Sequence, residues 1–212
     1  MNQVSMSGKD GFWARVRAAL GRRDGDEPAY GQAAIARARG GRTQSGTRMQ
    51  DLLRQGWAVA AQRNVSLCVM TLEIDRFAPY HAAHGAAAVE ETMSALTSII
   101  AGLLPRPGDG CLRMGANGFM LVLPDMPLLM ARDLAGRIAG AVRGAGLANR
   151  ESHAGQVTLS IGLAVVNPQG KPDRKVTEAA MQALRKAQRR GLARLEIADL
   201  RAAGDSQKAR AA

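Results

Sequence analysis

The chain has 212 residues, of which 46% are hydrophobic and 22% are charged, and it carries a formal net charge of +11. This length supports one core with terminal extensions. No apolar run is long enough to span a membrane or to form the centre of a secretory signal, so the composition excludes a membrane-spanning protein and predicts a cytoplasmic one.

The positive charge is concentrated in two segments. Residues 1–48 hold nine Lys/Arg against four Asp/Glu, a net +5, and residues 171–194 hold eight against two, a net +6. The remainder of the chain is neutral. A uniformly basic nucleic-acid-binding protein is therefore not expected, although each basic segment is suited to contact a polyanion.

The first expected element is a basic amphipathic helix over residues 1–23. The segment GFWARVRAALGRR places four apolar residues on one side: Phe12, Trp13, Val16 and Leu20. Such a helix suits the anionic surface of the inner membrane or a partner helix, but short helices also dock on their own domain or fray. Residues 24–48 are rich in Gly, Ala and Arg without periodicity, which predicts a flexible linker.

Residues 49–198 are expected to form the folded domain. Helical periodicity predicts helices over 49–63, 86–104, 128–144 and 176–190, and five apolar runs predict strands: SLCVMTLEI, CLRM, FMLVLP, QVTLSIGLAVV and ARLEIA. Asn117-Gly118 predicts a hairpin turn because both positions tolerate positive φ. The order of elements predicts an α/β fold, an α+β sandwich whose mostly antiparallel sheet is flanked by helices. The polar residues 199–212 are expected to be a disordered tail.

The cysteines and histidines do not predict a metal site. Cys68 and Cys111 lie in strand-like runs, outside any short-spaced pair, and are expected to be reduced core residues. His81 and His84 have the HxxH spacing, but no third ligand is near them in the sequence. We interpret both histidines as polar loop residues.

Four segments resemble a known family. LEIDRF, RMGANGF, VTLSIGLAVV and AMQALRKAQRRGLARL follow the order and spacing of the GGDEF domain, and the resemblance extends from about residue 49 to residue 198. The usual opening motif, DPLTGLxNRR, is not recognisable in GRTQSGTRMQDLL. Active members make cyclic di-GMP from two GTP molecules, and the resemblance implies a palm-like nucleotide-cyclase fold.

The resemblance also implies that the GTP site is degenerate. In the GG(D/E)EF hairpin three positions have changed: Ala116, Asn117 and Gly118. The acid missing at Gly118 would help to hold magnesium ions against the triphosphate, and Glu73 stands where the family has its other metal-binding Asp. A single carboxylate is a poor two-metal site.

The positions at which the family recognises GTP have changed as well. The phosphate-contacting Lys corresponds to Ala78, the guanine-contacting Asn to His81, and the guanine-contacting Asp to Glu90. The basic pair of the late AKxxGR motif corresponds to Gln188 and Leu192. An amide and an isobutyl group cannot neutralise a triphosphate. We therefore expect no enzyme activity, no catalytic residues, no metal and no bound cofactor.

The family's product-binding site is retained in sequence. Many members carry RxxD before the hairpin and an Arg on the following helix, and here Arg106, Asp109 and Arg137 occupy these positions. A guanidinium can bind guanine O6 and N7 or a phosphate, and a carboxylate accepts hydrogen bonds from guanine N1 and N2. The resemblance therefore implies a cyclic di-GMP site at these three residues.

The same three residues also have a purely structural interpretation. RxxD spacing recurs in this chain at Arg23/Asp26 and Arg48/Asp51. Asp109 lies in PGDG, a common turn composition, and Arg137 is one helical turn from Asp133, with which it can pair. Only the position relative to the hairpin favours a ligand site.

Three functions remain open from the sequence. The first is a non-catalytic cyclic di-GMP receptor that signals to an unidentified protein partner through its amphipathic N-terminal segment or its basic helix. The second is an interaction or scaffold module that acts without a ligand. A homodimer is compatible with each of these two functions. The third is a basic domain that associates with an anionic membrane or with nucleic acid through residues 1–48 and 171–194. Residues 1–23 are the expected membrane contact, and nucleic acid is disfavoured by the localised charge.

Overall fold

The structure is a computed structural model that describes residues 35–36 and 42–201. The predicted amphipathic helix over 1–23 lies outside these residues, as does most of the predicted linker and tail. No helix in the described ranges is both long enough and apolar enough to cross a membrane.

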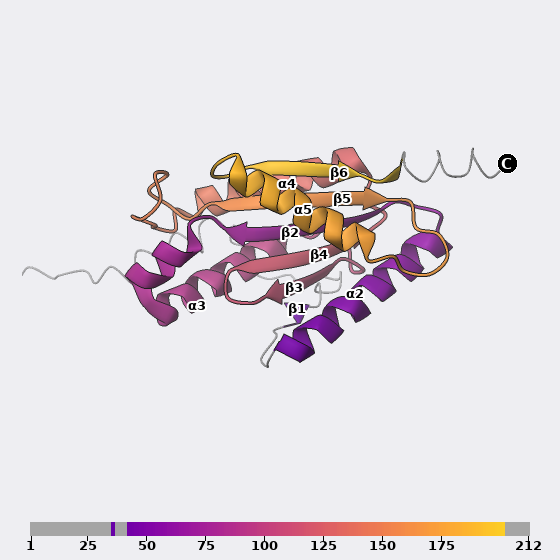
Figure 1. The fold of residues 1–212 in the computed structure, drawn as a ribbon, viewed down its shortest axis with the longest axis horizontal. Coiled ribbons are helices and arrows are strands. Elements are labelled where there is room, and N and C mark those ends of the chain that lie inside the picture. Colours follow the sequence, from indigo (N-terminus) through magenta and orange to yellow (C-terminus); the bar gives the residue numbers. More distant parts are fainter. Residues whose placement is uncertain (1–34, 37–41, 202–212) are drawn as a thin grey trace, which may run out of the picture.

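The domain is built on one sheet of six strands in the order β1-β3-β4-β2-β5-β6 (Figure 1). The strands are β1 (Ile35–Ala36), β2 (Leu67–Ile74), β3 (Gly110–Met114), β4 (Gly118–Pro124), β5 (Leu159–Val166) and β6 (Leu195–Asp199). The three central pairings are antiparallel, whereas β1 pairs with β3 and β6 pairs with β5 in parallel. The predicted α/β fold with a mostly antiparallel sheet is confirmed.

Helices cover both faces of the sheet. They are α2 (Arg42–Gln62), α3 (Phe77–Leu103), α4 (Leu128–Gly144) and α5 (Lys175–Arg189). Helices α2 and α5 pack on one face, and α3 and α4 pack on the other (Figure 1). Because both faces are covered, the central strands β2, β4 and β5 are apolar along almost their whole length rather than alternating.

Asp75 joins three segments at the end of β2. Its side chain accepts hydrogen bonds from the Thr158 hydroxyl (2.7 Å), the Ser160 hydroxyl (2.5 Å) and the Ala193 backbone N–H (2.8 Å). The residue is only 5% exposed. A buried carboxylate needs several donors to offset its lost hydration, so Asp75 fixes the start of β5 and the turn that leads into β6.

Helix α5 lies directly on β5 at Gly162. A Cβ atom at this position would come within 2.1 Å of the Leu184 nitrogen and 2.3 Å of the Ala180 oxygen. Both of these are backbone atoms that cannot move independently of the helix. The glycine therefore permits the close approach that sets the position of α5.

Two boundaries differ from the sequence prediction. The predicted linker over 24–48 contains β1, and α2 begins at Arg42 rather than at Met49. The first turns of α2 read RTQSGTR and carry no apolar stripe, which is why periodicity could not locate this start.

The interpretation of His81 and His84 as loop residues was wrong, because both lie in the first turns of α3. Gly85, with φ 75° and ψ 172°, interrupts the helix directly after them. The expected start of a helix near residue 86 corresponds to the second part of α3.

The hairpin turn also differs from its prediction. The loop between β3 and β4 spans residues 115–117, and its positive φ is at Gly115 (62°) rather than at Asn117 and Gly118. Gly118 is a strand residue that pairs with Met114. Because Gly118, in β4, already pairs with Met114, Asn117 and Gly118 do not form the two-residue turn that an Asn-Gly pair favours.

Candidate functional site

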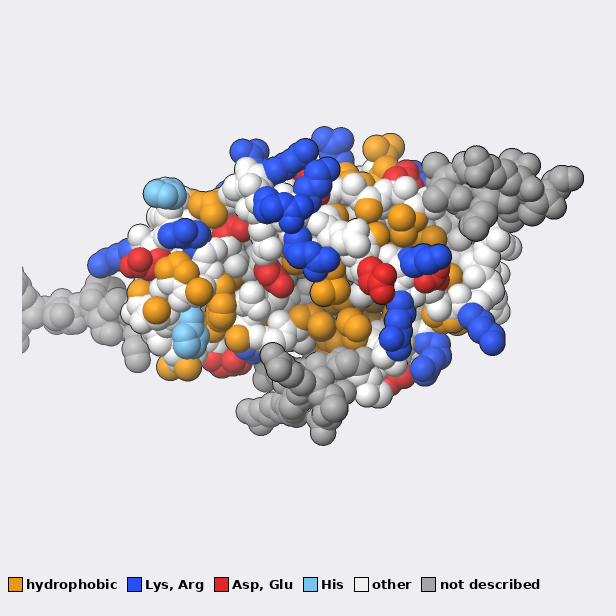
Figure 2. All heavy atoms as spheres, viewed as in Figure 1, with side chains coloured by type: hydrophobic (Ala, Val, Ile, Leu, Met, Phe, Trp, Pro, Cys, Tyr) orange, Lys and Arg blue, Asp and Glu red, His pale blue; other side chains and the backbone are white. Residues whose placement is uncertain are grey.

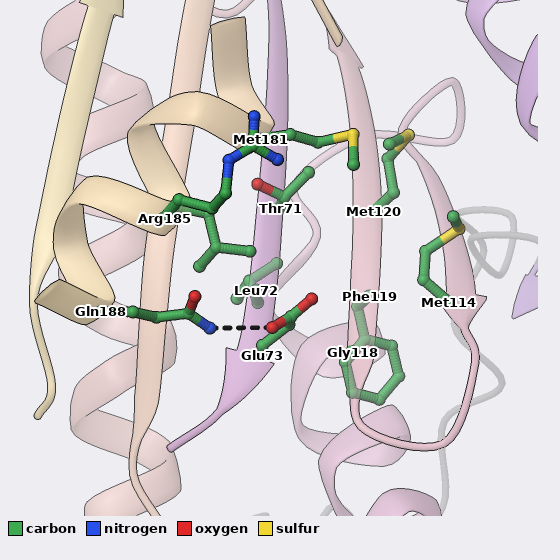
Figure 3. Close-up of a pocket in the computed structure, with 11 residues that line it drawn as sticks. Thr71, Leu72, Glu73, Met114, Gly118, Phe119, Met120, Met181, Arg185 and Gln188 are labelled. Carbon is green, nitrogen blue, oxygen red and sulfur yellow. Dashed lines mark hydrogen bonds between the residues drawn. The ribbon is translucent and has the colours of Figure 1, made fainter. Parts of the chain in front are cut away.

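A pocket of about 250 Å³ lies between α5 and the strands β2 and β4, at the position where the resemblance places the GTP site. Figure 3 shows side chains from α5 facing side chains of the two strands and the hairpin. The lining residues are Thr71, Leu72, Glu73, Met114, Gly118, Phe119, Met120, Met181, Leu184, Arg185 and Gln188. Most of this lining is apolar.

The single acidic residue of the pocket is engaged by an amide. Gln188 Nε2 on α5 donates a hydrogen bond of 2.8 Å to Glu73 Oε2 on β2 (Figure 3). Both of these positions were identified from the sequence as degenerate GTP-site positions, and the structure brings them into contact. The sequence did not predict the hydrogen bond between them.

Gly118 leaves no room for a side chain. It pairs with Glu73 across the strands, and a Cβ atom at Gly118 would lie 2.8 Å from the Leu72 carbonyl oxygen and 3.0 Å from Glu73 Cγ. The hairpin is held at this point because the Ile74 N–H donates to the Asn117 oxygen at 2.9 Å. An acidic side chain at residue 118 therefore requires the hairpin or β2 to shift.

The pocket residues do not fit the magnesium ions that a GGDEF active site uses. Mg²⁺ prefers several oxygen ligands in octahedral geometry. Here one carboxylate is present, and one of its oxygens already accepts a hydrogen bond. Within residues 35–36 and 42–201 no group of three or more His, Cys, Asp or Glu side chains is arranged to hold a metal ion.

One cation lies at the pocket. Arg185 on α5 extends over Met181 and Thr71 (Figure 3). It makes no hydrogen bond or ion pair with another residue of the described chain, so its guanidinium is available to solvent or to a ligand.

Glu90, the residue at the position expected to contact guanine, is paired with an arginine. Arg113 on β3 forms a bidentate ion pair with Glu90 on α3, at 2.7 and 2.8 Å. Arg113 Nε also lies 3.3 Å from the Gly115 carbonyl oxygen. Sequence analysis did not identify Arg113, because a lone Arg in the run CLRM gives no local sign of a partner 23 residues away.

The other positions that the resemblance assigns to the GTP site take no part in this ion pair. Ala78 and His81 are exposed on the first turn of α3, and Ala116 is exposed in the hairpin loop. Leu192 is partly buried in the turn between α5 and β6. The side chains of Ala78, Ala116 and Leu192 carry no charge that could bind a phosphate.

The RxxD residues form a structural clamp. The Arg106 backbone N–H donates to Asp109 Oδ2 at 2.9 Å. The Arg106 guanidinium donates to the backbone oxygens of Pro124, at 3.1 Å, and Asp125, and lies 3.5 Å from the Asp125 carboxylate. Arg106 therefore ties the loop after α3 to the end of β4.

Asp109 points into the protein. It is 2% exposed, and its Oδ1 atom has no hydrogen-bond partner among the described residues. Burial raises the pKa of this carboxyl to about 6, against the lowering effect of the Arg106 N–H and the Arg106 charge. Such an unsatisfied buried acceptor requires an explanation.

Arg137 does not share this clamp. It is exposed on α4 and forms no hydrogen bond or ion pair with Arg106, Asp109 or the neighbouring Asp133 in the described part of the chain. The structure brings Arg106 and Asp109 together but leaves the Asp109 carboxylate inaccessible.

The two cysteines offer no nucleophile. Cys68 and Cys111 are buried and not disulfide-bonded, and burial raises the pKa of each thiol to about 12. Both thiols are therefore protonated at neutral pH. The prediction that they are reduced core residues is confirmed.

Several solved structures share this fold. The GGDEF domain of DgcB from Caulobacter crescentus, solved in complex with c-di-GMP, is 22% identical, with 84% of this chain and 97% of that chain covered and a TM-score of 0.65. The active GGEEF domain of a diguanylate cyclase from Vibrio cholerae is 20% identical over 71% of this chain and 94% of that chain, with a TM-score of 0.63. Diguanylate cyclase SiaD from Pseudomonas aeruginosa, solved with its activator SiaC, is 24% identical over 71% of this chain and 57% of that chain, with a TM-score of 0.61.

At these identities the solved structures establish the fold alone. No curated protein shows a significant match to the chain. The sequence matches the family described as "Diguanylate cyclase, GGDEF domain" over residues 45–194, which is more than half of its length. The chain therefore belongs to the GGDEF domain family.

Proposed function

We propose that this protein is a non-catalytic GGDEF domain that binds cyclic di-GMP and signals to a protein partner. One observation supports the loss of catalysis: Gly118 and Glu73 are paired across neighbouring strands, where two metal-binding acids would be needed. Gly118 has no side chain, and the Glu73 carboxylate is hydrogen-bonded to Gln188. Phosphoryl transfer depends on metal ions and on positioning for most of its rate. This pocket supplies neither a metal-ligand pair nor a phosphate clamp.

An assay with GTP and Mg²⁺ tests the loss of catalysis. The purified protein is expected to make no cyclic di-GMP, and Gly118→Glu is expected not to restore synthesis. The new side chain must displace Leu72 or Glu73, and Gln188 and Leu192 still leave the triphosphate without the two cations of the family's late AKxxGR motif. Turnover that disappears in Glu73→Ala would contradict the proposal.

Arg106, Asp109 and Arg137 are the proposed ligand-binding residues. The DgcB structure that contains c-di-GMP supports this choice of ligand. The partnerless Asp109 Oδ1 is an acceptor of the kind that guanine N1–H and N2–H donors satisfy. Because this atom is buried, binding requires the loop over residues 104–109 to open.

A calorimetric titration with cyclic di-GMP tests this site. Arg137→Ala is the informative variant, because Arg106→Ala would also remove the clamp on Pro124 and Asp125. A bidentate arginine contact to guanine contributes about 1–3 kcal/mol, so Arg137→Ala should weaken binding roughly 10- to 100-fold. Arg132→Ala, an exposed arginine on the same helix, is the matched control and should leave binding unchanged.

Two results would overturn the ligand assignment. The first is the absence of heat at high protein concentration, and the second is equal binding by Arg137→Ala and Arg132→Ala. Cyclic di-AMP should bind poorly, because adenine lacks the N1–H and N2–H donors that a carboxylate accepts.

The burial of Asp109 favours a second candidate function, an interaction module that acts without a ligand. In this case Arg106 and Asp109 serve only to fix the loop between α3 and β3. The complex of SiaD with its activator SiaC supports a protein partner in general. A protein that binds a partner equally well with and without cyclic di-GMP would support this candidate.

A further inference from the structure

Strand β6 forms an open edge of the sheet. It pairs with β5 alone, and the Ile161 N–H donates to the Arg194 oxygen while the Leu200 N–H donates to the Val165 oxygen. In a parallel pair alternate residues bond the neighbouring strand. The backbone N–H and C=O groups of Leu195, Ile197 and Asp199 therefore point away from the sheet, and no group in the described chain bonds them.

This edge is only partly protected against pairing. The strand reads LEIAD and carries two acidic residues, Glu196 and Asp199, but it contains no proline, which would remove an outward N–H. A row of unpaired backbone donors and acceptors is a template for an added strand.

A groove of about 460 Å³ runs beside the edge, between β6 and α5. Its lining includes three small residues, Ala179, Ala183 and Ala198, and three cationic residues, Arg185, Lys186 and Arg189, which we call the rim. Figure 2 shows Lys and Arg side chains gathered over α5. The groove therefore combines small apolar side chains with a positive rim.

The positive charge of this rim is only partly neutralised. Glu196 is the acidic residue of the lining, and its side chain is 11% exposed. It forms ion pairs with Lys186 at 2.9 Å and with Arg190, and the hydrogen bond from Lys186 lowers the pKa of this carboxyl. Arg185 and Arg189 have no ion pair within residues 47–201, so the rim retains an excess of positive charge.

The opposite face of the edge is apolar. Leu195 packs against the core beneath α3 and α4, and strand alternation places the Ile197 side chain on that same face, while Ile197 also borders the groove. Ile197 is 37% exposed, so its apolar surface is incompletely covered. A strand added to β6 would meet cations on the α5 side and apolar surface on the other side.

We propose that the edge of β6 binds an extended, amphipathic and acidic segment of a protein partner as an additional strand. Acidic side chains of that segment point toward the unpaired cations Arg185 and Arg189, and the alternating apolar side chains cover Ile197. A nucleic acid would use the cations but not the outward N–H and C=O groups, and the groove lining contains no aromatic side chain on which bases could stack. The site supplies the partner surface of the proposed signalling function and rests on that function for its role.

Binding is tested with the full chain and a labelled peptide of alternating Glu and Val, about eight residues long, slightly longer than an average strand. Fluorescence anisotropy should show saturable binding that weakens as salt increases. Arg189→Glu should weaken this binding roughly three- to tenfold, because it replaces an attraction by a repulsion. Arg150→Glu makes the same charge change on an exposed residue outside the groove and should have no effect.

Amide hydrogen exchange distinguishes backbone pairing of the peptide from simple attraction between charges. Peptide binding should slow exchange at Leu195 and Ile197, whose N–H groups point outward, and a peptide with Pro at alternate positions should not bind. No saturable binding at low salt, unchanged exchange at both amides, or tighter binding of a single-stranded oligonucleotide would overturn the proposal. None of these measurements uses cyclic di-GMP, so failure here is distinguishable from failure of the ligand assignment.

Discussion

Asp75 and Asp109 are both buried carboxylates, yet they are hydrogen-bonded to very different extents. Asp75 is 5% exposed and accepts hydrogen bonds from three donors in two other segments of the chain. Asp109 is 2% exposed and accepts one, from a residue three positions earlier. Burial is nearly equal, so the number of donors is what separates the two sites.

The difference indicates which carboxylate has a structural role and which is open to further chemistry. With its donors in place, Asp75 stabilises the junction of β2, β5 and the turn before β6. Asp109 keeps one oxygen without a partner, and its pKa is raised to about 6. A proton or a ligand donor at Asp109 would therefore have a larger effect on its site than at Asp75.

Asp75→Asn should produce the largest loss of stability. The amide N–H₂ group cannot accept from the Ser160 hydroxyl, the Thr158 hydroxyl and the Ala193 N–H together, so at least one buried donor loses its partner. We expect the free energy of unfolding to fall by about 3 kcal/mol in a denaturant titration. Asp51→Asn, on an exposed side chain paired with Arg54, should change it by less than about 1 kcal/mol. Equal effects of the two substitutions would refute the structural role of Asp75.

Asp109→Asn should change how stability depends on pH. The pKa of Asp109 rises from 3.8 to about 6 on folding, so between these values the folded state holds a proton that the unfolded chain has released. Stability therefore falls as pH rises through this interval, by about 3 kcal/mol if the whole shift is expressed. Asp109→Asn cannot titrate and should remove this component.

The measurement is the difference between variant and parent in the free energy of unfolding from pH 4 to pH 7. Asp133→Asn, on an exposed carboxyl of α4, is the control and should follow the parent. If the Asp109→Asn curve is parallel to the parent curve, the carboxyl is not held at a raised pKa.

Gln188→Leu should have the smallest effect and extends the comparison to an exposed carboxylate. Glu73 also accepts one hydrogen bond, from Gln188, but this pair is open to solvent. Water can replace the lost donor, so we expect a change in the free energy of unfolding of at most about 0.5 kcal/mol by thermal or chemical denaturation. A loss as large as that of Asp75→Asn would show that the pocket is closed to water.

The order of strands and helices could be predicted from sequence because it depends on local periodicity. The apolar runs of β2, β4 and β5 and the helical stripe of α5 are each visible within a short window. The polar start of α2 and the two-residue strand β1 were missed because neither has a local pattern. β1 exists through its pairing with β3, which only the folded chain brings close.

By itself the sequence, through its resemblance to the GGDEF family, predicted that a carboxylate is absent at Gly118 and a cation at Leu192, because the side-chain type at a position is visible without coordinates. Tertiary structure alone decided what the remaining side chains contact. Glu73 is hydrogen-bonded to Gln188, which lies 115 positions later in the sequence, and Glu90 is paired with Arg113, which lies 23 positions later. The burial of Asp109 and the open edge of β6 likewise arise from packing and strand order. Hydrogen bonds and burial depend on distances that the folded chain sets, and residue spacing along the sequence does not encode them.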